Sequence, residues 1–388
     1  MIFLCLSFSQ LLATLKHLAL SGSFEQAQLA VECIINLWCQ PQSSEVKSHD
    51  DAEALNVGES EGDVILTEIL TEHVDDNLAI DSPRLVTALA VASKVARLNF
   101  PLFRHLTDVR TRFLTLVNAE LLPTDAIVEY QQERQAGIEL VQNFLYSFGQ
   151  SGGTFAQEST MTSAEMAISP KSLLAVLIKI IKLDGRYPIA GMSTAQQLAQ
   201  ITSQSVKETD ESQVARYEFL LAVAFALLEL LTVQIYHRFF VHPSPEAIAQ
   251  YKSRHDRTNR TDGDDSTTNL LASPKSRTHA STAPLHRFSF HILPIAYLAF
   301  HHLPELSKRF LQRVLELMKT GKLSYSLYVT ILVLGASHPE EALVAELKTA
   351  CMSVANQSGE RNSAPHNLIL SSTAAYFFLF VVFILLLS

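Results

Sequence analysis

The sequence predicts an all-α protein, built from helical hairpins that stack as in HEAT or armadillo repeats. Apolar residues recur at helical spacing along most of the 388 residues, whereas the apolar–polar alternation of strands is scarce. The 13 glycines and 14 prolines are few for this length and gather between the apolar segments. Repeat units are expected to start near residues 83, 126, 170 and 212, a spacing typical of HEAT and armadillo repeats. Because each hairpin leaves an apolar face uncovered until a neighbour stacks on it, we expect an α-solenoid superhelix.

The clearest helical pair runs from Ser82 to Leu121. Ser82 and Pro83 are typical of a helix start, since serine caps free N–H groups and proline has no N–H to lose there. The apolar face of this first helix is Leu85, Leu89, Ala92 and Ala96, with Lys94 and Arg97 off it. After a break at Asn99-Phe100-Pro101, the second helix has the inward positions Leu106, Val109, Phe113, Leu116 and Leu121. Helices joined by so short a turn are expected to fold back on each other.

Residues 1–39 are expected to form a helical hairpin. The apolar start, Met1–Leu20, lacks the positive residues and the small-residue cleavage site of a signal peptide, which is the alternative for such a stretch. Ser21-Gly22 forms the turn into a second helix over Phe24–Trp38. Residues 40–63 then carry seven acidic residues against one lysine, so we predict a disordered acidic loop, with a binding tail as the alternative.

Residues 64–251 are expected to hold the main array of HEAT-like helical repeats. Besides the pair above, helices are predicted over Val64–His73, from the polar start 131–134 to Phe148, from Ser169-Pro170 to Asp184, over Ala195–Gln204 and over Glu211–Val233. The last of these is strongly apolar. Arg216, Glu218 and Glu229 interrupt it, which favours a buried central helix over a membrane span.

Residues 252–284 are polar and are predicted to form a disordered insertion that is basic at its start. The basic residues are Lys252, Arg254, Arg257 and Arg260, the candidates for a contact with nucleic acid or a partner protein. A solvated loop is the alternative, because no aromatic residues interleave with them. Ser244 and Ser273 each precede a proline and are candidate phosphorylation sites, where added phosphate would reverse the local charge.

HEAT-like repeats are expected to resume over residues 285–357. An amphipathic helix is predicted with the inward positions Leu306, Phe310, Val314 and Leu317. Residues 323–336 are apolar almost all round and therefore belong inside the array. A final helix is predicted from Pro339, with the inward positions Leu343, Leu347, Ala350 and Val354.

No motif in the sequence indicates catalysis or a cofactor. Glycine-rich phosphate loops and HExxH are missing from the sequence. The letters GxSxG occur once, as Gly149-Gln150-Ser151-Gly152-Gly153, but they follow a predicted helix and not the strand that a nucleophile elbow requires. The pairs His237/His242 and His301/His302 have no cysteine or carboxylate at zinc-ligand spacing, so we expect no metal. The formal charge of −9 argues against bulk nucleic-acid binding. The four cysteines form no CxxC pair and are expected to be buried, reduced thiols.

Residues 368–388, which follow a linker at 358–367, differ from the rest of the chain. They are apolar or carry small hydroxyl groups, and as a helix they would extend about 31 Å, roughly one hydrocarbon thickness of a bilayer. We predict a transmembrane tail anchor; an edge helix docked on the array, or sequence foreign to the fold, are the alternatives. The membrane-insertion candidates are Tyr376, Phe377, Phe378, Leu379, Phe380, Val381, Val382, Phe383, Ile384, Leu385, Leu386 and Leu387.

Several segments of the chain resemble the Pds-five (precocious dissociation of sisters) family of cohesin regulators, over roughly residues 11 to 355. The segments that carry the resemblance are Phe24–Ile34, Ser82–Ala92 with Ala96-Arg97-Leu98 and Pro101-Leu102-Phe103, Ala136–Leu145, and Arg309–Leu315 followed by Leu323–Gly335 and His338-Pro339. They look like helical segments of the family's middle region, in the same order and with similar spacing. The resemblance implies that the chain corresponds to the middle portion of a longer HEAT superhelix.

The resemblance also implies a function in mitosis and cell division. Members of the family are nuclear, chromatin-associated proteins that bind the kleisin subunit of cohesin and the releasing factor Wapl, and so control sister chromatid cohesion. The family's N-terminal motif for Wapl and sororin peptides is not found in this sequence, so no binding residue is carried over. A terminal membrane segment is foreign to a chromatin protein, which favours a truncated or misassembled gene product with an extraneous tail.

Three functional hypotheses follow from the sequence. The first is a non-enzymatic HEAT-repeat scaffold that controls cohesion by binding a kleisin, with chromatin contacted indirectly and a Wapl-like factor as a second partner. The second is a tail-anchored helical-repeat adaptor that faces the cytosol and binds other proteins. The third, an enzyme on a helical scaffold, is supported only by scattered histidine and glutamate residues.

Overall fold

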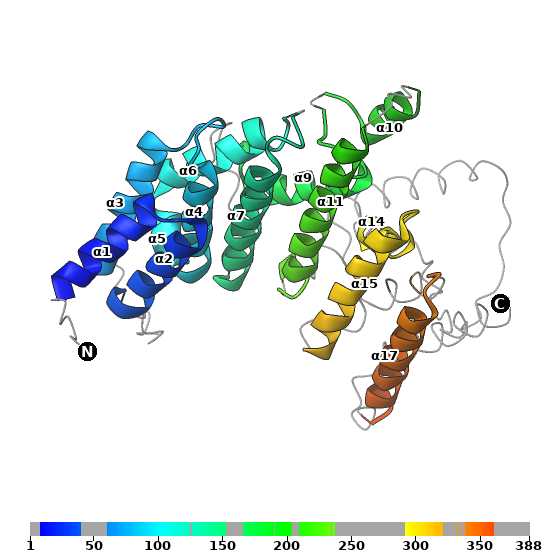
Figure 1. Cartoon of the computed structure of the whole chain (residues 1–388). Coiled ribbons are helices and arrows are strands. Elements are labelled where there is room, and N and C mark those ends of the chain that lie inside the picture. Colours follow the sequence, from blue (N-terminus) through cyan, green and yellow to red (C-terminus); the bar gives the residue numbers. More distant parts are fainter. Residues whose placement is uncertain are drawn as a thin grey trace, which may run out of the picture. The chain divides into compact units, whose positions relative to one another are not determined.

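The protein is all-α, as the sequence predicts. The computed structural model describes residues 8–39, 60–124, 126–152, 166–189, 191–203, 209–233, 235–236, 292–320, 331, 335 and 338–360. Over these residues there are thirteen α-helices and no strand (Figure 1). The chain divides into two compact units, Met1–Val233 and Gln234–Ser388. The boundary between them falls before residue 251, where the sequence analysis ended the main array.

The first unit contains ten α-helices among its described residues, and one π-helical turn, η1. They are α1 (Phe8–Ser21), α2 (Phe24–Trp38), α3 (Glu61–Asp76), α4 (Leu85–Leu98), α5 (Phe100–His105), α6 (Thr107–Thr115), η1 (Leu116–Leu121), α7 (Gln131–Gln150), α9 (Pro170–Lys182), α10 (Thr194–Ser203) and α11 (Asp210–Leu230). The predicted hairpin over residues 1–39 is confirmed for α1 and α2, which pack on each other.

The helices of this unit pack in two rows. The first row is α2, α4, α7 and α11, and each of these helices contacts the next one. Figure 1 shows them side by side in chain order. In the second row α1 contacts α3, α3 contacts α6, and α6 runs into η1. The rows contact each other through the pairs α1–α2, α2–α3, α3–α4 and η1–α7, and α9 contacts both α7 and α11. Most large apolar side chains of these helices are therefore buried, whereas Leu29 and Leu37 of α2 and Val214 of α11 stay exposed.

Helix α4 is buried on nearly all sides, although the sequence indicated a single apolar face. Its predicted inward residues are all buried. The further buried residues are Ala88, Ala90, Val91, Ser93 and Val95. Helices α2, α3 and α7 pack around it. Alanines along α4 leave space for close neighbours, which explains why a helix with small side chains can lie at the centre of the unit.

Residues Ser82 to Leu121 depart from the helical hairpin that the sequence predicted. Helix α4 begins at Leu85, after a turn in which the Leu85 N–H donates to the Ser82 carbonyl at 3.1 Å, and the Arg84 guanidinium donates to the Leu20 carbonyl at 3.2 Å. The expected second helix is divided into α5, α6 and η1, with a break at Leu106 (φ −73°, ψ 66°). The second helix was expected to pack on α4. Instead α6 contacts α3, and α4 contacts α7.

Helix α3 begins at Glu61, earlier than the predicted start at Val64. The Ser60 side chain accepts a hydrogen bond from the Asp63 N–H at 3.1 Å and caps the helix. Residues 61–63, which the sequence analysis placed in the acidic loop, are therefore helical. Residues 40–59 of that loop lie outside the described residues.

The second unit contains α14 (Ile292–Ala296), the 3₁₀ turn η4 (Tyr297–Phe300), α15 (Pro304–Lys319) and α17 (Glu341–Glu360) among its described residues. The predicted amphipathic helix is confirmed as α15, whose four predicted inward residues are buried. Lys308 pairs with Glu340 at 2.9 Å and Lys319 with Glu346 at 2.7 Å, so two ion pairs link α15 to α17 and the residue before it.

Several sequence predictions concern residues outside the described part of the chain. They are the phosphorylation candidates Ser244 and Ser273, the basic cluster Lys252, Arg254, Arg257 and Arg260, the insertion 252–284, residues 361–367 of the linker and the apolar segment 368–388 with its insertion candidates Tyr376 to Leu387. The linker was predicted over 358–367, but residues 358–360 are the end of α17. Within the described residues, none of the helices combines the length and the hydrophobicity needed to cross a bilayer.

Candidate interaction surface

Seven polar residues form a continuous group across the four helices of the first row. We call this group the transverse cluster; its members are Glu32 of α2, Lys94 and Arg97 of α4, Glu139, Gln142 and Tyr146 of α7, and Glu229 of α11. Each helix contributes to a contact with another helix of the row. The cluster therefore connects helices that are far apart in sequence.

The link between α2 and α4 is an ion pair. The Lys94 ammonium lies 3.2 Å from a Glu32 carboxylate oxygen, and the two side chains are 28% and 42% exposed. Water competes for both groups at this exposure, so the pair contributes little to folding stability. Its charged groups are accessible to a partner molecule.

The link between α4, α7 and α11 is centred on the Glu229 carboxylate. Arg97 donates to one of its oxygens at 3.0 Å and Gln142 donates to the other at 2.6 Å. The Arg97 guanidinium also stacks over the Tyr146 ring, with 3.3 Å between its central carbon and the ring centroid. A carboxylate with both oxygens bound to different helices fixes the positions of those helices, because moving either helix breaks a charge-assisted hydrogen bond.

Glu139 lies between these two links. Burial raises the pKa of its carboxyl group, and the nearby Glu229 charge acts in the same direction. The Lys94 charge and a hydrogen bond from Ser93 lower the pKa but do not cancel the effect of burial. Ser93 in turn accepts a hydrogen bond from Asn143 at 2.8 Å, and both of these residues are buried between α4 and α7. Glu139 is thus connected, through Ser93, to the buried side chain of Asn143.

The transverse cluster brings together an ammonium group, a guanidinium group, carboxylates, a primary amide and a phenol ring from four helices. Among the described residues no group of three or more histidine, cysteine, aspartate or glutamate residues could hold a metal ion. His301 and His302 stack with 4.1 Å between ring centroids, and His237 and His242 lie outside the described residues.

The two cysteines whose surroundings the structure describes, Cys33 and Cys39, are not in a disulfide. The prediction of buried thiols is wrong for Cys33, which is exposed, and Cys39 is half-buried. Burial raises the pKa of the Cys39 thiol to about 12, and the Asp63 carboxylate contributes to the rise. A thiol that stays protonated at neutral pH is a poor nucleophile.

Sequence reasoning did not find the transverse cluster. It identified Lys94 and Arg97 only as residues off an apolar face, and Glu229 only as an interruption of a hydrophobic helix. The Lys94–Glu32 contact joins residues 62 apart in sequence, and Arg97–Glu229 joins residues 132 apart. The available signal was a charged residue in each of two largely apolar helices, Arg97 in α4 and Glu229 in α11. Helical periodicity does not indicate which charged residues contact each other in the fold.

Comparisons with known proteins add no assignment. No protein-family model matches the sequence, and no curated protein matches it either.

Proposed function

We propose that the chain is a non-enzymatic HEAT-like α-solenoid scaffold that binds an extended segment of a partner protein across the first row of helices. The observation that carries the proposal is the contact of α2 with α4, α4 with α7 and α7 with α11. Serial stacking of this kind is the packing pattern of helical-repeat proteins, which use the resulting surfaces to bind polypeptides. The transverse cluster is the binding surface in this proposal.

The proposed partner is the kleisin subunit of cohesin, with a Wapl-like releasing factor as a second partner. The resemblance of four segments to Pds-five proteins supports this choice, and three of those segments overlap α2, α4 and α7 of the first row. In this proposal the protein works in the nucleus, contacts chromatin through cohesin and regulates sister chromatid cohesion during the cell cycle.

Co-precipitation of the full chain with a cohesin kleisin tests the proposal. We expect retention of the kleisin at low salt, because polar contacts to the transverse cluster weaken as salt screens them. Two variants locate the surface. Lys94→Ala removes the pair with Glu32 in the first row, and Arg112→Ala removes a pair with Asp75 that has the same 3.2 Å separation but joins α6 to α3 in the second row.

The expected result is reduced retention for the Lys94→Ala variant and unchanged retention for Arg112→Ala. Absence of any association at low salt would contradict the kleisin assignment. Equal loss in the two variants would contradict the assignment of the first row as the binding surface.

A second candidate function is a tail-anchored adaptor that faces the cytosol. The apolar run of residues 368–388 is the observation that favours it. In this case deletion of residues 367–388 moves the protein from the membrane pellet to the supernatant. A full-length protein that is already in the supernatant and in the nucleus rejects this candidate.

A further inference from the structure

His73 is a fully buried histidine that joins the end of α1 to α3. It lies in the last turn of α3, and its exposed fraction is 0%. Its Nε2 atom lies 3.1 Å from the Ala19 carbonyl oxygen of α1, and its Nδ1 atom lies 3.3 Å from the side-chain nitrogen of Asn77. Both ring nitrogens are therefore engaged, one of them by a residue 54 positions away in sequence.

These two contacts fix the ring as the neutral tautomer that carries its hydrogen on Nε2. A carbonyl oxygen only accepts hydrogen bonds, so Nε2 donates to Ala19, and Nδ1 accepts from the Asn77 amide. The Asn77 backbone N–H donates to the His73 carbonyl at 3.0 Å and keeps this amide next to the ring. A second proton on Nδ1 would face the amide donor. Rotation of the amide would restore a hydrogen bond but not the hydration of the buried charge.

The charged groups around His73 do not offset its burial. Burial lowers the pKa of the ring, and the Arg84 charge acts in the same direction. The hydrogen bond to Ala19 and the charges of Glu72 and Asp76 raise the pKa, but less than burial lowers it. The ion pairs that join α1 and α6 to α3, and α4 to α2, are Lys16–Glu68, Arg112–Asp75 and Lys94–Glu32.

This lowered pKa makes stability depend on mild acid. The contribution of neutral His73 is fully present above the unfolded pKa, about 6.5, and is lost as the pH falls through the folded pKa. Glu139 acts in the opposite direction, because its pKa is raised in the folded protein. A fall in stability between pH 7 and pH 5 is therefore the reverse of what Glu139 contributes.

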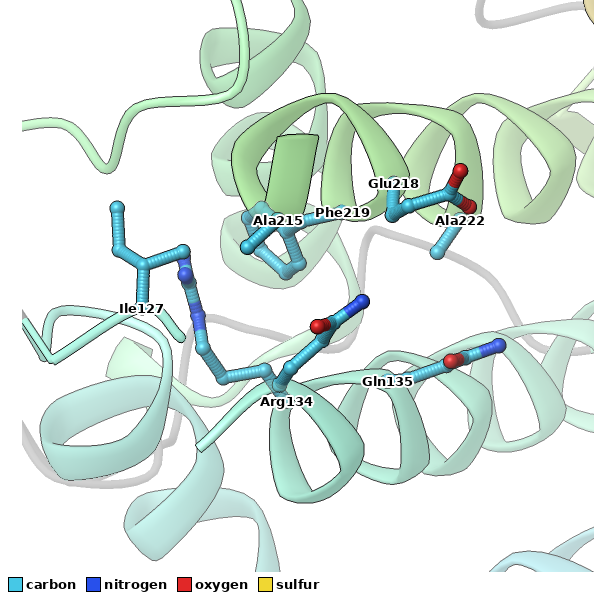
Figure 2. A pocket seen from close by; sticks show the side chains of 8 residues that line it. Ile127, Arg134, Gln135, Ala215, Glu218, Phe219 and Ala222 are labelled. Atoms are coloured by element: carbon cyan, nitrogen blue, oxygen red, sulfur yellow. The ribbon is translucent and has the colours of Figure 1, made fainter. Parts of the chain in front are cut away.

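Arg134, between α7 and α11, is a buried base that does not respond to mild acid. It is only 2% exposed, and its guanidinium stacks on the Phe219 ring at 3.9 Å. Figure 2 shows the side chain between the labelled residues Ile127 and Phe219. Burial lowers the pKa of Arg134 to about 10, so this side chain is charged at both pH 7 and pH 5.

We propose that His73 is an acid-sensitive latch, which holds α1 against α3 while the ring is neutral and loosens this contact when Nδ1 takes up a proton. Helix α2 packs on both α1 and α3, so the latch acts on the three N-terminal helices. The latch lies within the first unit, and the inference does not depend on the partner proposed above.

Urea unfolding of the full chain, followed by tryptophan fluorescence, tests the latch. Trp38 is the only tryptophan of the chain and is buried in α2, so its emission reports on the helices around His73. We expect the unfolding midpoint of the wild-type protein to fall from pH 7 to pH 5. His73→Gln should show a clearly smaller fall, because its amide can donate to Ala19 and accept from Asn77 but does not titrate. His17→Gln, the matched change at an exposed histidine of α1, should keep the wild-type fall.

An equal fall in the wild-type protein and in His73→Gln would overturn the proposal, as would a wild-type midpoint that does not fall. Should His73→Gln fail to fold, Asn77→Asp decides the matter. Its carboxylate accepts a hydrogen bond from protonated Nδ1, so the difference between the two midpoints should shrink. A difference as large as that of the wild-type protein would contradict the latch.

Hydrogen exchange of the wild-type protein locates the effect. After correction for the intrinsic exchange rate, we expect the protection of α1 amides to be lower at pH 5 than at pH 7, with little change in α7. An equal change in α1 and α7 would overturn the proposal, because it would indicate general acid destabilisation and not the release of one contact.

Discussion

Arg97 and Glu229 form the most enclosed link of the transverse cluster. Their side chains are 28% and 24% exposed, so water screens the pair only in part. We predict that a double-mutant cycle with Arg97→Met and Glu229→Gln, measured by urea unfolding, gives a coupling free energy of about 1 kcal/mol. The exposed pair Arg112–Asp75, at 57% and 62%, is the control and should give less than about 0.5 kcal/mol. Equal coupling in the two cycles would show that the cluster is no better fixed than a surface ion pair.

Glu139 is predicted to reduce stability at neutral pH. Because its pKa is raised in the folded protein, its contribution is favourable below the unfolded pKa and is lost as pH rises through the folded pKa. We expect Glu139→Gln, which resembles the protonated acid, to raise the free energy of unfolding at pH 7. The gain should disappear near pH 4, where the glutamic acid of the unfolded chain is itself largely protonated. Urea unfolding at both pH values measures this difference; a variant less stable at pH 7 would contradict the assignment of burial as the main cause.

Local sequence signals placed some helix ends correctly and missed others. Ser169 caps α9 through the Ser172 N–H at 3.3 Å, with Pro170 as the first helical residue, as its Ser-Pro sequence predicted. The same Ser-Pro signal at Ser82 precedes a turn, and Arg84 in this turn contacts the Leu20 carbonyl of α1. A capping signal is local, whereas that contact joins residues 64 apart in sequence. The Ser-Pro signal alone therefore did not locate the first residue of α4.

Two residues with positive φ follow the end of α9, Asp184 (φ 55°) and Gly185. Gly185 has φ +83°, and a Cβ there would lie 2.9 Å from the Arg216 carbonyl oxygen of α11. Gly152 also has a positive φ, +72°, but a Cβ there would meet no atom within 4 Å. We predict that Gly152→Ala costs about 1 kcal/mol of unfolding free energy from backbone strain alone.

The matched substitution Gly185→Ala should cost clearly more, about 2–3 kcal/mol, since the new methyl group also displaces α11. Urea unfolding of both variants measures the two costs. Similar values would indicate that α9 and α11 are not packed closely at this point.

Arg134 and Arg216 are buried charges that helical periodicity did not predict. The sequence suggested a polar helix start for Arg134 and an interruption for Arg216, yet both are buried. Arg216 pairs with Asp184 at 2.6 Å, at the end of α9. Each arginine lies in a helix that is otherwise well predicted. Helix positions were therefore accessible from local pattern, whereas the partners of buried charges depend on which helices meet.

On the scale of the whole molecule, the all-α class follows from composition and periodicity, but the repeat spacing does not hold in detail. The first helices of the observed pairs begin at Phe8, Glu61, Thr107 and Pro170, which is less even than the predicted starts near 83, 126, 170 and 212. The pairing is also different, since α4 is the second helix of its pair with α3. The connecting segments differ in length, and this changes the spacing between repeat starts without changing the apolar faces of the helices. Repeat spacing in the sequence is therefore a poor guide to where each hairpin begins.

The most direct test of the proposed scaffold function is the binding of short kleisin peptides. Fluorescent peptides that overlap along a cohesin kleisin are titrated with the full chain, and anisotropy reports binding. We predict that one group of neighbouring peptides binds and that the double variant Lys94→Ala/Tyr146→Ala weakens binding at least about tenfold. Arg112→Ala should leave it unchanged. No binding by any peptide at low salt, or an equal loss with Arg112→Ala, would contradict the account.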